Sequence, residues 1–173
     1  MGVDYERELK KLLEGEMADL ARMKKTCNAL QCEGYEVMER YPFMVIRGAG
    51  SFGTDLVALR GELSFPIEVK SSKHPKMYLS QPRLKEQLEV FLEDCRKANT
   101  FPVYAFRLKG HKGDPWRVYT IDIEDLRYFS RILNRKIPSL RGTPGGNYVM
   151  EWEFGMPLSD LLKEIGKICS SLR

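Results

Sequence analysis

Apolar residues recur with a helical period in three parts of the chain. Over residues 4 to about 33 the spacing predicts one or two helices, with Gly15 and the later Gly34 as expected break points. The same period predicts a helix that begins near Pro82 and a closing helix that begins near Leu158. Helices are therefore expected at both ends of the chain and in its middle.

Between these helices the patterns are typical of strands. Extended segments are expected at 43–47, 55–59, 63–70, 101–108 and 117–121, with weaker signals at 35–40, 77–79 and 149–154. The second and third segments form a hairpin, and the last two strong ones an antiparallel pair. Pro66 lacks an N–H, so we expect its part of the hairpin at an edge or a bulge. The order predicts an α/β fold with a mixed central β-sheet flanked by α-helices.

The candidate catalytic residues are concentrated in residues 47–71. A loop with three glycines in six residues leads to Asp55, but it has neither the P-loop nor the GxGxxG pattern, so a nucleotide site is not expected. Glu68 and Lys70 lie two residues apart on the next strand and therefore project from the same face. If the two strands pair, Asp55 approaches Glu68 and Lys70.

Such a group of charges suits a magnesium-dependent phosphodiester hydrolase. Mg²⁺ prefers oxygen ligands, which Asp55, Glu68 and the backbone carbonyl of Val69 can supply. Lys70 would orient the attacking water and stabilise the developing charge. Glu6, on the first helix, would add a further ligand or hold a metal-bound water. The alternative is an ordinary Glu-Lys alternation on a surface strand, which occurs by chance in many proteins.

Composition indicates an ordinary globular protein. Its 173 residues, 43% hydrophobic and 30% charged, fit one domain over residues 1–173. No apolar run approaches the roughly 20 residues of a membrane span, and the first helix is too charged for a secretory signal. The four cysteines form no CxxC pair and have no histidine at zinc-site spacing. A cytoplasmic protein with reduced cysteines and no membrane partner is expected.

Positive charge is concentrated in two segments. Residues 70–76 contain three lysines, one histidine and no acid, so Lys73 and Lys76 are candidate phosphate contacts. Residues 126–150 contain five basic residues and no acid. Irregular periodicity over 122–147 predicts a short helix near 123–133 and then a basic loop. A solvated basic surface is the alternative for either cluster.

The motif Asp55…Glu68-Val69-Lys70 resembles the PD-(D/E)xK nuclease signature without its preceding proline. More narrowly, the chain is similar to the archaeal Holliday junction resolvases over most of its length. The shared features are the acidic first helix with Tyr5-Glu6-Arg7-Glu8-Leu9, the loop Arg47-Gly48-Ala49-Gly50-Ser51, the strand Ile67-Glu68-Val69-Lys70, the later strands with Pro102 to Phe106 and Trp116-Arg117, and the closing Leu-rich helix.

The resemblance implies a restriction-endonuclease-like nuclease fold and a homodimer that binds branched DNA. Such an enzyme nicks two opposing strands of a four-way junction with Mg²⁺, for which Mn²⁺ can substitute. By position, Glu6, Asp55, Glu68 and Lys70 would be catalytic or metal-binding. The residues that would contact the DNA backbone near the cut are Arg7, Arg47 and Ser51.

The chain also departs from the family pattern. Glu6 and Asp55 are 49 residues apart, because extra sequence near 14–33 lengthens the first helical region. Gly48 replaces a serine of the family loop. Residues 122–147 look like a basic insertion relative to the family, at a place where a dimer or DNA surface could differ. Two other functions remain open: a repair or restriction-type nuclease of the same superfamily without junction preference, and a catalytically silent nucleic-acid-binding module.

Overall fold

The computed structural model describes residues 2–48, 54–80 and 82–172. The helices are α1 (Gly2–Leu13), α2 (Met17–Lys24), α3 (Ala29–Arg40), α4 (Pro82–Lys97), α5 (Tyr128–Lys136) and α6 (Leu158–Ser171), with a 3₁₀ turn at Trp152–Phe154. The strands are β1 (Met44–Arg47), β2 (Leu56–Leu59), β3 (Phe65–Ser72), β4 (Lys76–Leu79), β5 (Val103–Leu108), β6 (Trp116–Tyr119), β7 (Arg141–Gly142), β8 (Tyr148–Glu151) and β9 (Met156–Pro157).

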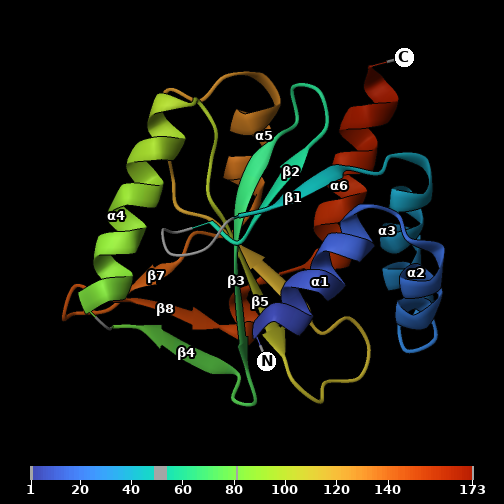
Figure 1. Cartoon of the computed structure of the whole chain (residues 1–173), viewed down its shortest axis with the longest axis horizontal. Helices are drawn as coiled ribbons and strands as arrows, with labels where there is room; N and C mark the ends of the chain where they lie inside the picture. The colour runs from blue at the N-terminus through green and yellow to red at the C-terminus, as the bar shows by residue number, and fades with distance from the viewer. Residues whose placement is uncertain (1, 49–53, 81, 173) are drawn as a thin grey trace.

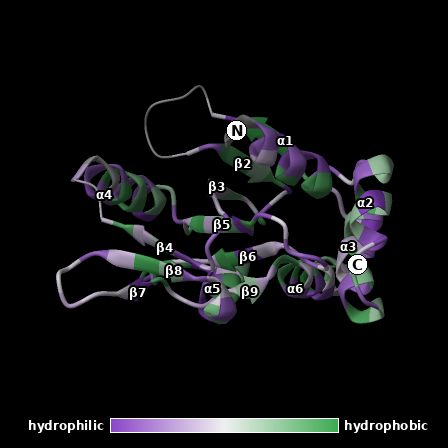
Figure 2. Cartoon of the chain, turned by 90° about the horizontal axis from the view of Figure 1, so that it is seen from below, coloured by the Kyte–Doolittle hydropathy of each residue, from purple (hydrophilic) through white to green (hydrophobic). Residues whose placement is uncertain are grey.

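The strands form a larger mixed sheet and a smaller antiparallel one. The larger sheet has the order β1-β2-β3-β5-β6-β9, in which only the β3–β5 pair is parallel (Figure 1). The smaller sheet, β4-β8-β7, was not expected from the sequence. Figure 2 shows α4 and the smaller sheet on one side of the larger sheet, with α2, α3 and α6 on the other. The mixed sheet flanked by helices is therefore confirmed, as are the β2–β3 hairpin and the antiparallel β5–β6 pair.

Pro66 lies in a central strand rather than at an edge or bulge, so that prediction is wrong. The bond from Asp55 N to Ile67 O shows that the backbone of Ile67 points to β2. The neighbouring backbone of Pro66 therefore points to the β5 side, where pairing begins only at Ile67 and Val103. The missing N–H falls just before the parallel ladder, and no hydrogen bond of the ladder is lost.

The N-terminal region contains three helices within its described residues, and the strand expected at 35–40 is part of α3. Gly15 separates α1 from α2 with a φ of +72°, as expected for a break. Gly34 instead lies inside α3, where a Cβ would come within 2.1 Å of the Ser159 carbonyl oxygen. This glycine allows α3 to approach the start of α6, a reason that local sequence does not reveal.

The buried carboxylate of Asp114 joins three elements of the core. Its Oδ1 accepts hydrogen bonds from the Tyr35 hydroxyl at 2.9 Å and from Trp116 N at 3.1 Å, and its Oδ2 accepts one from Ser159 N at 2.9 Å. Ser159 lies in the first turn of α6, where negative charge is favourable. Asp114 thus connects α3, β6 and α6 on one side of the sheet.

The segment 122–147 packs into the same core. Its helix α5 begins at Tyr128, later than expected, and Leu133, Ile137 and Leu140 are buried. The buried Asn134 amide donates to Thr120 Oγ1 at 2.9 Å and to Ile121 O at 3.0 Å. The expected basic loop carries the short strand β7, which pairs with β8.

Replacing Asp114 by alanine should destabilise the fold by about 3 kcal/mol, because three buried donors lose their acceptor. Tyr35→Phe, which removes one of these bonds, should cost about 1 kcal/mol. Urea unfolding monitored by circular dichroism measures both values. Equal midpoints for Asp114→Ala and the wild type would refute this role.

Candidate active site

Asp55 lies where β2 and β3 begin to separate. Its backbone N–H donates to Ile67 O at 3.0 Å, although Leu56 is the register partner of Ile67, so Asp55 and Leu56 both face this one residue of β3. Further along β3, the Asp55 side chain replaces a backbone acceptor, and its Oδ2 accepts a hydrogen bond from Val69 N at 2.7 Å. The carboxylate is thereby held against the backbone of β3, between Glu68 and Lys70.

Glu68 and Lys70 project from the same face of β3, as the period of two predicted. Lys70 Nζ donates to Glu68 Oε1, and both side chains are largely buried. They line one cavity together with residues of β4, α4 and β5: Leu79, Gln87, Leu88, Phe91 and Tyr104. The three charged residues singled out from the sequence therefore converge.

Tyr104 is a neighbour of the site that sequence reasoning missed. It is the β5 partner of Glu68 in the parallel register, and its ring meets that of Phe91 edge-on at 5.9 Å. Burial raises the pKa of Tyr104 far above its usual range, and the charge of Glu68 adds to this. The strand–helix–strand order from β3 through α4 to β5 is the signal that could have predicted this pairing.

The carboxyl groups of Asp55 and Glu68 are partly withdrawn from water and close enough to hydrogen-bond to each other. Burial raises the pKa of Asp55, and the charge of Glu6 raises it further, although the Val69 N–H and Lys70 act in the opposite direction. Burial likewise raises the pKa of Glu68, with Lys70 opposing and Asp55 reinforcing the shift. A divalent cation bound here would favour the ionised form of both groups, because it would oppose the effect of burial on their pKa values.

The oxygen atoms at this point fit Mg²⁺. The N–H and C=O of a strand residue point to the same side, so the Val69 carbonyl also faces Asp55. Asp55, Glu68 and this carbonyl would supply three ligand groups, and water would complete the coordination, as Mg²⁺ usually requires. Within residues 2–48, 54–80 and 82–172, no group of three or more His, Cys, Asp or Glu side chains is arranged to hold a metal. A Mg²⁺ site here would therefore have two carboxylate side chains as protein ligands, together with the Val69 carbonyl.

Glu6 and Arg47 form an ion pair beside this centre. Arg47 Nη2 lies 2.8 Å from Glu6 Oε2, and α1 packs against β2 and β3, the strands that carry the site. Arg7 is exposed. Glu8, not predicted as a site residue, fixes this end of α1 by accepting bonds from Arg107 Nε at 2.8 Å and Trp116 Nε1 at 2.9 Å.

The remaining predicted DNA contacts have different surroundings. Ser51 lies outside the described residues. Lys73 is exposed in the turn between β3 and β4. Lys76 Nζ is 3.5 Å from Glu151 Oε2 and lies 5.2 Å from the centre of the Tyr78 ring, so its charge is partly compensated.

A comparison with family models shows to which protein family the chain belongs. The model of the archaeal Holliday junction resolvase (Hjc) matches residues 32–167. The chain belongs to the archaeal Holliday junction resolvase family. The match includes Asp55, Glu68 and Lys70 but begins within α3, so it excludes Glu6 and Arg7. The fold and family predicted from the sequence are confirmed.

Other comparisons add less to the Hjc assignment. The structure of Archaeoglobus fulgidus Hjc, a Holliday junction resolvase from an archaeal hyperthermophile, is 25% identical in sequence. The alignment covers 73% of this chain and 93% of that chain with a TM-score of 0.46, and the family assignment does not depend on it. Curated proteins gave no significant match. Among the described helices, none is long and apolar enough to cross a membrane.

The Asp55–Glu68 pair should make stability depend on Mg²⁺ and pH. Because the folded protein raises both pKa values, ionisation of the pair destabilises the metal-free fold increasingly as pH rises through them. Mg²⁺ should therefore raise the melting temperature of the wild type at neutral pH but not that of Asp55→Asn. Without metal, Asp55→Asn should melt higher than the wild type at neutral pH, and the difference should vanish in acid.

Differential scanning fluorimetry over pH, with Mg²⁺ or EDTA, measures these shifts. Glu36→Gln, an exposed carboxylate on α3, is the matched control and should respond as the wild type does. An equal response of Asp55→Asn and the wild type to Mg²⁺ would exclude Asp55 as a ligand.

Proposed function

We propose that this chain is a Mg²⁺-dependent endonuclease that resolves four-way DNA junctions by paired nicks as a homodimer. The observation that carries the proposal is the meeting of Asp55, Glu68, the Val69 carbonyl and Lys70 where β2 ends. Membership of the Hjc family identifies branched DNA as the substrate class. Such junctions arise in recombination and repair, and the free cysteines suit a protein of the reducing cytoplasm.

The site residues have separable tasks in phosphodiester hydrolysis. Mg²⁺, or Mn²⁺ in its place, would neutralise charge on the phosphate and make water easier to deprotonate. Asp55 and Glu68 would hold the cation beside β3, with their positions fixed by Val69 N and Lys70. Lys70 Nζ would orient the attacking water and stabilise the charge that develops on the phosphoryl oxygens.

The Glu6–Arg47 pair would position the DNA strand. Its contact at 2.8 Å fixes the guanidinium beside the carboxylates, where it can bind a phosphate next to the scissile one. Arg7, exposed on the same helix, and Ser51 would contact the backbone nearby. Glu6 would act through Arg47 or through a metal-bound water.

Two symmetric nicks require two active sites, and β1 offers a surface on which copies could meet. Met44 and Ile46 lie on one face of this edge strand and are 63% and 51% exposed, whereas Val45 on the other face is buried. An uncovered apolar edge strand is a natural place for pairing between chains. A two-fold axis there would give each dimer two equivalent sites.

Asp55→Asn, Glu68→Gln and Lys70→Ala should each reduce junction cutting by roughly 10²–10³-fold or more, because each removes a group that acts on the reacting phosphate. Junction binding should persist, since phosphate contacts elsewhere supply most of the affinity. Single-turnover cleavage and gel-shift titration measure the two properties. Wild-type activity in these variants would refute the site.

A panel of four-way, flap and linear substrates separates the remaining functions in the same assay. Preferential cutting of four-way junctions is expected. Equal cutting of flaps or linear duplex would indicate a superfamily nuclease without junction preference. Binding without cutting in Mg²⁺ or Mn²⁺ would indicate a silent module.

Met44→Lys combined with Ile46→Lys should convert the dimer to a monomer, because two buried cations would face their copies across the axis. Sedimentation velocity measures the change. Met17→Lys with Leu30→Lys, at positions 61% and 64% exposed on α2 and α3, is the matched control and should remain dimeric. A dimer that survives the β1 substitutions would place the interface elsewhere.

A further inference from the structure

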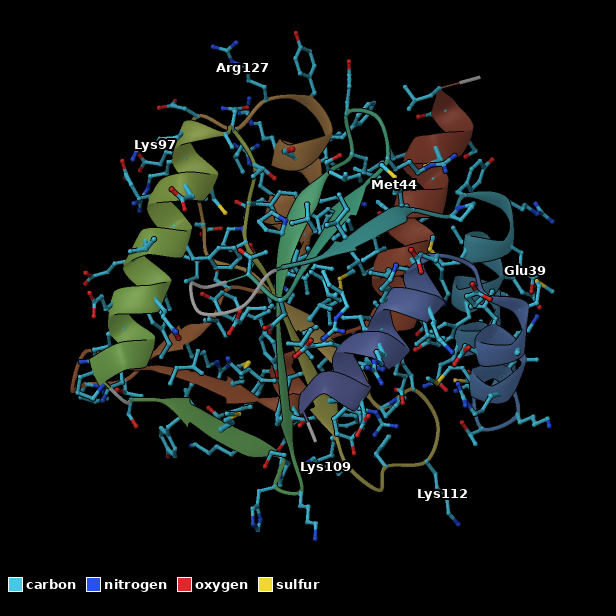
Figure 3. The ribbon with its side chains drawn as sticks, in the orientation of Figure 1. Glu39, Met44, Lys97, Lys109, Lys112 and Arg127 are labelled. Carbon is cyan, nitrogen blue, oxygen red and sulfur yellow. The ribbon has the colours of Figure 1, made fainter. Side chains whose placement is uncertain are left out.

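A group of lysines lies at the end of the sheet where β3 and β5 finish. Lys73 belongs to the β3–β4 turn, and Lys109 and Lys112 belong to the β5–β6 loop. The hydrogen bond from Lys109 N to Ser72 O, at 2.8 Å, joins the two segments. Figure 3 shows Lys109 and Lys112 at the same end of the molecule, opposite Lys97 and Arg127. We call these three lysines the basic end.

The charges of the basic end are not compensated. With the residues that the structure describes, none of its lysines forms an ion pair, whereas the nearby Lys76 is paired with Glu151. Lys109 Nζ instead lies 5.5 Å from the centre of the Tyr5 ring, which Arg107 also approaches, at 4.7 Å. Three unpaired cations in joined segments repel one another, and an anionic ligand would relieve this repulsion.

The surface chemistry favours a nucleic acid over a protein partner. Neither residues 72–76 nor residues 109–115 present a large exposed hydrophobic side chain, and a protein interface usually needs one at its centre. Lysine ammonium groups bind phosphate as point charges and do not identify bases. Such contacts suit a partner that is recognised by backbone and shape.

Strand β3 connects the basic end directly to the active site. Glu68 and Ser72 are both in β3, so at about 3.3 Å per residue they are about 13 Å apart. A duplex rises about 3.4 Å per nucleotide, so this distance corresponds to about four nucleotides. A DNA arm that leaves the scissile phosphate along β3 would reach the basic end at that point.

We infer that Lys73, Lys109 and Lys112 bind phosphates of the DNA arm about four nucleotides from the cut. The inference rests on the proposed function and extends it, because it assigns the direction in which the arm leaves the active site. It also adds two residues of the β5–β6 loop to the substrate surface.

The test compares the variant Lys73→Gln/Lys109→Gln/Lys112→Gln with the wild type on a synthetic four-way junction in Ca²⁺. Each lost contact should lower the slope of log affinity against log salt by about 0.9, and weaken binding roughly fivefold to tenfold at 0.1 M salt. Arg96→Gln/Lys97→Gln/Lys167→Gln, with the same loss of charge on α4 and α6, is the matched control and should keep the wild-type slope.

A second measurement locates the contact. Junctions that carry one neutral methylphosphonate at successive positions should bind wild type more weakly when the substitution is about four nucleotides from the cut. The basic-end variant should be insensitive to the same substitution, because the contact is already lost. Circular dichroism melts check that the variant is folded, and the three single substitutions repeat the test with less change in charge.

The outcomes separate this inference from the proposed function. If wild type cuts the junction but the variant keeps its salt slope and its methylphosphonate sensitivity, the basic end is not an arm contact and only this inference fails. An equal loss of slope in the control variant would also overturn it, because net charge alone would explain the effect. If wild type neither binds nor cuts junctions, the proposed function and this inference both fail.

Discussion

The hydrogen bond between Val69 N and the Asp55 carboxylate is the contact on which the active site depends. It lies one step beyond the last backbone pairing of the β2–β3 hairpin, so a side chain continues the ladder that the backbone has left. This bond places a carboxylate, a strand carbonyl and the Glu68–Lys70 pair around one point. The cost is a half-buried pair of carboxyl groups whose pKa values are both raised, and such perturbed pKa values are common at functional sites.

Local periodicity was enough to predict this centre. Alternation along β3 placed Glu68 and Lys70 on one face, and the short hairpin brought Asp55 beside them. Tyr104 could not be found in the same way, because its position depends on the parallel register between strands separated by α4. The sequence predicts Lys76 as a phosphate contact. In the fold, the smaller sheet places Glu151, which is 75 residues further along the chain, beside Lys76.

The sequence predicts a strand at residues 35–40, which belong to α3 in the structure. Residues 35–40 alternate weakly enough to resemble a strand, but a capping box at Asn28 and Gln31 starts α3 before them. Gly34 then lets this helix pack on α6, and Asp114 holds both helices to β6. The capping box is local, but contacts between elements distant in sequence decide how α3 packs, whereas the charged centre is built within one hairpin. The proposed active site was consequently more predictable from the sequence than the elements that support it.

Whether the protein resolves junctions by paired nicks can be tested with a supercoiled plasmid that extrudes a cruciform, incubated with the wild-type protein and Mg²⁺. Two nicks placed symmetrically across the junction within one binding event convert the circle directly into linear DNA. A junction resolvase should give linear product whose ends map to the cruciform base, with little nicked circle at early times. Nicks distributed over the plasmid, or equal cutting of a plasmid without the cruciform, would contradict junction resolution.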